Sequence, residues 1–83
     1  MARAKIIAFH KCIGDCTITE LEKDGKRYFK AKIVGWDNFK FISETLKPQE
    51  LFNRVIIEVA KIKKLVEEDA DEVENLPLTY NIK

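Results

Sequence analysis

The feature that most constrains this chain is an Asp-Gly pair, Asp24-Gly25, between two strand-like runs. Both central residues of a type I′ turn take a positive φ, so such a pair between alternating runs predicts a tight β-hairpin. Placing these two residues at the centre of the turn fixes the pairing on either side. Glu22 then lies opposite Arg27, and the pairs continue residue by residue from there.

The predicted hairpin has one apolar face and one polar face, because side chains alternate along a strand. The apolar face carries Cys16, Ile18, Phe29, Ala31 and Ile33, with Glu20 as its polar exception. The polar face carries Thr17, Thr19, Leu21, Tyr28, Lys30 and Lys32. A register slip of one residue would bury two lysines and expose two large apolar side chains. We therefore expect the first face against the core and the second in solvent.

A long amphipathic helix is predicted from Pro48 to about Glu68. Proline suits the first helical position, and Glu50 lies in the first turn, where the helix dipole favours a carboxylate. Apolar residues recur at helical spacing: Phe52, Val55, Ile56, Val59, Ile62 and Val66. Ile57 falls on the opposite side and Leu65 at the border, so the helix is more apolar than one sheet can cover. We expect Ile57 and Leu65 to take part in self-association.

Three further strands are expected. The run Ala4 to Lys11 is apolar on both sides near its middle, which favours a central place in the sheet. Phe39 to Ser43 predicts a short fourth strand, and alternation after Pro77 predicts a last edge strand at the C-terminus. The expected fold class is α+β: a mostly antiparallel sheet of three to five strands with one long helix on one face, in the order β-β-β-β-α-β.

Length and composition indicate one small domain, residues 1–83, in which residues 67–76 form an acidic linker or a frayed helix end. The chain is 46% hydrophobic and 35% charged, which excludes wholesale disorder. A domain of this size has little room for a deep enzyme cleft with its own lid. The sequence shows neither a membrane-span pattern nor a secretion signal, so we expect a cytoplasmic protein with no membrane partner.

Candidate chemical groups are few. His10, Cys12 and Cys16 are the only histidine and cysteines, and their spacing lacks the paired cysteines of structural zinc sites. On one strand His10 and Cys12 would lie about 6–7 Å apart, too far for a nucleophile and its base. A disulfide between Cys12 and Cys16 is disfavoured in the cytosol. We expect a protein that is not an enzyme and has neither metal nor cofactor.

The polar hairpin face is the candidate binding site. Its hydroxyls, aromatic ring and ammonium groups come from Thr17, Thr19, Tyr28, Lys30 and Lys32. This mixture contacts single-stranded nucleic acid through stacking and phosphate contacts. Residues 1–47 contain ten Lys or Arg and six Asp or Glu, whereas residues 48–83 contain five and eight, so the sheet half is basic. We expect a non-enzymatic, homodimeric macromolecule-binding domain whose partner is nucleic acid or protein.

An acidic run supports an alternative function. Residues 67–74 are all carboxylates apart from Ala70 and Val73. Such a run can imitate a phosphate backbone and occupy a basic groove of another protein. The alternative is therefore an acidic inhibitor or nucleic-acid mimic that binds a basic protein, of the kind that mobile elements encode.

The order of elements is similar to that of two families. Over about residues 17–66 the chain resembles the small antitoxin domains of the HicB type. The shared order is a strand, a turn with Lys-Asp-Gly, a second strand, a short strand and a helix that Glu44 to Leu51 open. A similar strand order occurs in double-stranded-RNA-binding domains, although the basic helix start that they use is replaced here by Pro48-Gln49-Glu50. The first resemblance implies an antitoxin-like inhibitor.

Overall fold

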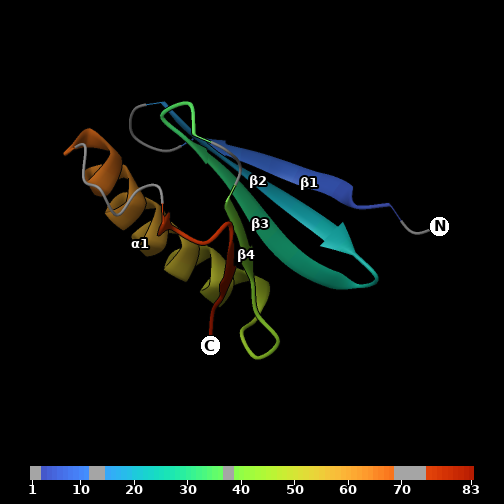
Figure 1. The fold of residues 1–83 in the computed structure, drawn as a ribbon. Helices are drawn as coiled ribbons and strands as arrows, with labels where there is room; N and C mark the ends of the chain where they lie inside the picture. Colours follow the sequence, from blue (N-terminus) through green and yellow to red (C-terminus); the bar gives the residue numbers. More distant parts are fainter. Residues whose placement is uncertain (1–2, 12–14, 37–38, 69–74) are drawn as a thin grey trace.

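The described residues form one five-stranded sheet and one helix. The computed structural model describes residues 3–11, 15–36, 39–68 and 75–83. The elements are β1 (Lys5–Lys11), β2 (Cys16–Lys23), β3 (Lys26–Ile33), β4 (Phe39–Ile42), α1 (Pro48–Glu67) and β5 (Thr79–Asn81). The helix lies on one side of the sheet (Figure 1). The α+β class and the order β-β-β-β-α-β are therefore confirmed.

The strands lie in the sheet in the same order as in the chain, β1-β2-β3-β4-β5. The first four form an antiparallel meander, and β5 pairs parallel to β4 after the chain has passed through α1. The predicted central place of β1 is wrong, because this strand is an edge. The strand has apolar residues on both sides, but these side chains are not buried. A β-bulge between Ile6 and Ala8 interrupts their alternation.

The hairpin has the predicted register. Pairing runs from Cys16 opposite Ile33 to Lys23 opposite Lys26. Asp24 has φ 55° and Gly25 has φ 78°, the positive values that a type I′ turn requires. The local turn chemistry therefore determines which side chains of β2 and β3 face α1.

The core lies between α1 and one face of the sheet. The helix contributes Leu51, Val55, Val59 and Ile62 to it. The strands and the C-terminus contribute Cys16, Ile18, Phe29, Ala31, Ile33, Phe39, Phe41 and Ile82. The helix begins at Pro48, as predicted, but Ile56 is exposed although the periodicity placed it in the apolar stripe. The stripe that faces the sheet is narrower than that periodicity indicated.

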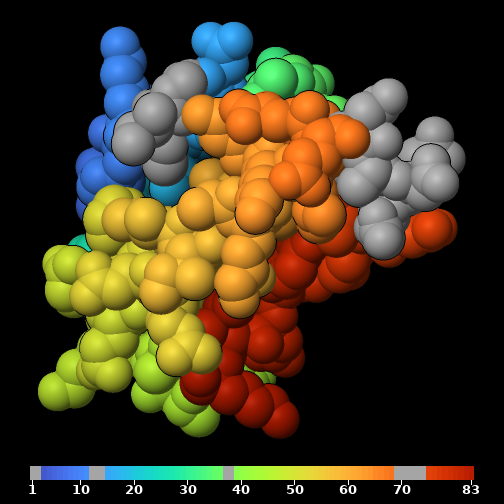
Figure 2. All heavy atoms as spheres, turned by 90° about the vertical axis from the view of Figure 1, so that its left-hand side faces the viewer, coloured from blue at the N-terminus to red at the C-terminus, as the bar shows by residue number. Residues whose placement is uncertain are grey.

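Opposite ends of the chain lie near the two flanks of the helix (Figure 2). Figure 2 shows the C-terminal segment along one flank of α1 and β1 near the other. The Ile82 N–H donates a hydrogen bond to the Ile42 carbonyl (2.8 Å), which holds this segment against β4. The helix ends at Glu67, and residues 69–74 of the acidic run lie outside the described residues.

Candidate nucleic-acid interface

The predicted binding residues share one surface. We call the sheet face that lies opposite α1 the open face. Strand register places Thr17 and Thr19 of β2 on this face, opposite Lys32 and Lys30 of β3. The β3 members of this set are Tyr28, Lys30 and Lys32. The five side chains therefore lie together on the sheet side that does not pack against the helix.

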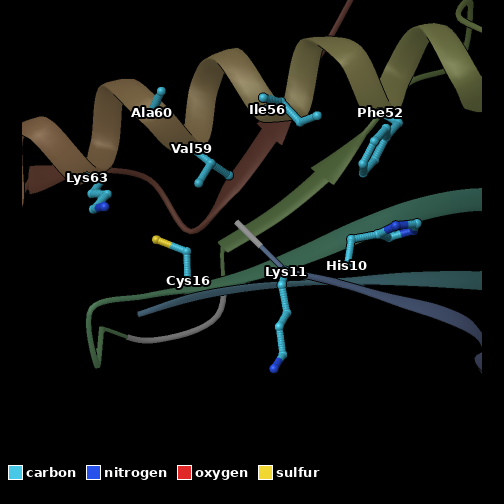
Figure 3. Close-up of a pocket in the computed structure, with 8 residues that line it drawn as sticks. All are labelled: His10, Lys11, Cys16, Phe52, Ile56, Val59, Ala60 and Lys63. Carbon is cyan, nitrogen blue, oxygen red and sulfur yellow. The ribbon is translucent and has the colours of Figure 1, made fainter. Parts of the chain in front are cut away.

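Strand pairing adds three side chains to the open face that the hairpin alone did not indicate. Phe9 of β1 lies opposite Thr19, and Lys11 of the same strand lies opposite Thr17. Lys40 of β4 lies opposite Lys30. In Figure 3, Lys11 points away from α1 whereas the neighbouring His10 lies on the helix side of the sheet. A continuous row thus crosses the sheet from β1 to β4.

The open face is positively charged. Alternation and register place six lysines on it: Lys11, Lys23, Lys26, Lys30, Lys32 and Lys40. Among the residues that the structure describes, the strand positions on this face carry no carboxylate, since Glu20 and Glu22 both lie on the helix side. The strand positions of this face therefore carry charge of one sign only.

A cation–π contact joins two members of this surface. The Lys40 Nζ lies 4.9 Å from the centroid of the Tyr28 ring. At a partly exposed site such a contact contributes about 0.5–1 kcal/mol. Stacking of a nucleic-acid base on an aromatic ring contributes more, about 1–3 kcal/mol. A base can therefore take the place of the ammonium group over the ring, while the ammonium group pairs with a phosphate.

A hollow adjoins this contact at the hairpin end of the open face. It has a volume of about 360 Å³ and lies between the turn and the end of β4. Its lining includes Lys23, Lys26, Tyr28, Lys40 and Ser43, together with the carboxylates Asp24 and Glu44. The hollow brings ammonium groups and one aromatic ring to a single depression.

Leu21 differs from the expectation of a fully solvated face. It lies on the open face but is only 9% exposed, and the register places it between Ile6 on β1 and Tyr28 on β3. Its neighbours on the open face therefore cover Leu21, and this side chain supports the surface from beneath without offering contact area to a ligand.

A charged cluster on the helix side provides hydrogen-bond partners for Glu20, the polar exception on the apolar face of the hairpin. Glu20, 13% exposed, accepts from Arg27 Nη1 at 2.5 Å and contacts His10 Nε2 at 3.0 Å. The His10 ring lies 4.6 Å from the ring of Phe52 on α1. The cluster ties β1, β2 and β3 to the helix, and we assign it a structural role.

An apolar groove lies between α1 and the β1–β2 end of the sheet. It has a volume of about 300 Å³, and Figure 3 shows its lining, which includes Cys16, Phe52, Ile56 and Val59. The Cys16 thiol is free and buried, whereas Cys12, which the disulfide and zinc alternatives require, lies outside the described residues. The described part of the chain contains no group of three or more His, Cys, Asp or Glu placed to hold a metal ion.

The two residues expected in self-association lie on different parts of α1. Ile57 is 51% exposed on the outer side of the helix, and it neighbours Ile56, which is also exposed. Leu65 is half-buried. Of the two, Ile57 is the more accessible to a second chain.

Comparison with protein-family models, with curated proteins and with solved structures gave no match. The similarity to HicB-type antitoxins therefore concerns the order of elements only. Within the described ranges, no helix combines the length and the apolarity that crossing a bilayer requires.

Proposed function

We propose that this chain is a small, non-enzymatic domain that binds nucleic acid through the open face. One observation carries the proposal: six lysines, two aromatic rings and two threonine hydroxyls share a surface on which the described strand residues include no carboxylate. Each of these groups has a counterpart in nucleic acid. Ammonium groups pair with phosphates, rings stack on bases, and hydroxyls bond to phosphate or sugar oxygens.

The distribution of charge favours this surface over the rest of the molecule. The lysines of α1 are paired with acids of the helix and its C-cap: Lys61 with Glu58 at 3.7 Å and Lys64 with Glu68 at 4.0 Å. On the open face, by contrast, lysines lie opposite other lysines on neighbouring strands, as Lys30 lies opposite Lys40. Like charges directly opposite destabilise a sheet, so a polyanion that neutralises them gains affinity from both effects.

The proposal includes a cytoplasmic location. That compartment contains single- and double-stranded nucleic acid and keeps thiols such as that of Cys16 reduced. The acidic-mimic alternative rests on residues 67–74, of which 69–74 lie outside the described residues, so no structural observation favours it.

The test is binding of labelled DNA and RNA by fluorescence anisotropy over a range of salt concentrations. We expect log K to fall linearly with log salt, and the double variant Lys30→Glu/Lys32→Glu to lose about tenfold or more in affinity and to show a shallower slope. A matched control is Lys47→Glu/Lys83→Glu, which makes the same change of charge at two exposed lysines outside the strands of the open face and outside α1.

Retention of affinity in the control and loss in the sheet variant is the expected result. Equal loss in both variants would mean that net charge alone attracts the nucleic acid, and it would overturn the assignment to the open face. Absence of binding by the unaltered protein at low salt would overturn the proposed function itself.

A further inference from the structure

We propose that the open face selects single strands over duplexes and that Phe9 is the residue on which an unpaired base stacks. This inference rests on the proposed function, because it names the class of nucleic acid that the same surface binds. It adds a specificity-determining residue that the hairpin did not include.

Phe9 is placed to contact a ligand and not the core. Its side chain is 68% exposed, the highest value among the large apolar residues that the structure describes as exposed. It stands on the edge strand, opposite Thr19, and Lys11 follows it on the same face. A phenyl ring beside an ammonium group and a hydroxyl matches one nucleotide, with its base, phosphate and sugar.

The two aromatic residues of the open face are spaced for separate bases. Phe9 and Tyr28 lie two strands and two residues apart in the register. With strand spacing of about 4.8 Å and a rise of about 3.4 Å per residue, the separation of their Cα atoms is about 12 Å. One base cannot contact both rings, so an extended strand would place one base on Phe9 and a later one beside the Tyr28 hollow.

The geometry does not suit recognition of a duplex. The helix lies on the opposite face of the sheet, so it cannot enter a major groove from the open face (Figure 1). The β2–β3 hairpin is flanked by β1 and β4, so it is not a free two-stranded ribbon that could insert there. A duplex would meet the lysines through its phosphates and leave Phe9 without a partner, because its bases are already stacked.

The experiment compares oligo-dT and oligo-U with a DNA duplex of equal length, for the unaltered protein and the variants Phe9→Ala and Phe9→Tyr. We expect tighter binding of single strands by the unaltered protein, and a loss of about tenfold for Phe9→Ala with oligo-dT and oligo-U. Duplex binding should stay unchanged, and Phe9→Tyr should retain the affinity because its ring still stacks.

A spectroscopic readout separates stacking from indirect effects. In a Trp36→Phe background, Phe9→Trp should show fluorescence that single strands quench and the duplex does not. Light scattering of Phe9→Ala checks that the change leaves the oligomeric state as it was. A changed oligomeric state would assign Phe9 to contact with a second copy and overturn the inference.

The outcomes distinguish this inference from the proposed function. Binding of neither probe by the unaltered protein means that the proposed function fails. Equal binding of single strand and duplex, or equal loss for both in Phe9→Ala, overturns the single-strand inference while the function stands.

Discussion

The ammonium group of Lys40 on β4 lies over the ring of Tyr28 on β3, 4.9 Å from its centroid. The contact joins a phosphate-binding group to a stacking group across two neighbouring strands. It also keeps the ring covered by a charge that a ligand phosphate can attract away.

Replacing Lys40 with methionine should reduce the salt dependence of nucleic-acid binding. Lys40→Met keeps an unbranched side chain and removes one positive charge, so the slope of log K against log salt should fall by about 0.7 for a single strand. Anisotropy titrations at several salt concentrations measure this slope. Lys83→Met, outside the open face and α1, is the control, and an unchanged slope in Lys40→Met would show that this lysine contacts no phosphate.

Removing the Glu20 carboxylate should destabilise the fold more than removing that of Glu22. Glu20→Ala deprives Arg27 and His10 of a partly buried acceptor, at a cost of about 1–3 kcal/mol in the free energy of unfolding. Glu22 is 40% exposed and lies 3.4 Å from Arg27, so Glu22→Ala should cost about 0–1 kcal/mol. Urea denaturation measures both. Equal costs would contradict the structural role of the cluster.

The Tyr80 hydroxyl should make the protein sensitive to alkaline pH. Burial, and then the negative charge of Glu58, raise the pKa of Tyr80 above its usual 10.0. Above about pH 10 the unfolded chain loses this proton while the folded chain keeps it, so the free energy of unfolding falls as pH rises. Thermal unfolding between neutral pH and pH 11 should show a shallower decline for Tyr80→Phe than for the unaltered protein.

The same variant tests the packing at neutral pH. The Tyr80 hydroxyl is buried and has no hydrogen-bond partner among the described residues. Tyr80→Phe should therefore be neutral, or stabilising by up to about 1 kcal/mol. Tyr28→Phe on the open face is the control for loss of a phenol, and a clear destabilisation by Tyr80→Phe would reveal a partner for the hydroxyl.

We propose that the chain self-associates through the outer side of α1, where Ile57 is exposed. Light scattering should give about twice the mass of 9.7 kDa that one chain has. Ile57→Lys should give the mass of a single chain, because it places a charge in an apolar contact. Thr45→Lys, in the loop before the helix, should leave the mass of the dimer unchanged. A single-chain mass for the unaltered protein would remove this proposal.

Local signals predicted the hairpin and the start of the helix because each depends on neighbours in sequence. Asp24-Gly25 determined the turn and its register, and Pro48 marked the first residue of the helix. The open face was predicted only in part. Phe9 and Lys40 join it through pairing between strands, and the bulge in β1 reverses the alternation on which the position of Phe9 depends. No pattern within one strand reveals either effect.

The parallel pairing of β5 with β4 has a consequence for the order in which the chain acquires its structure. Contacts among β1 to β4 join neighbouring segments, so we expect them to form first, whereas the pairing of Tyr80 with Phe41 requires that the whole helix has been synthesised. A nascent chain on the ribosome would then present a meander with one apolar face uncovered until α1 emerges. During that interval this face is the part of the molecule on which a chaperone would act.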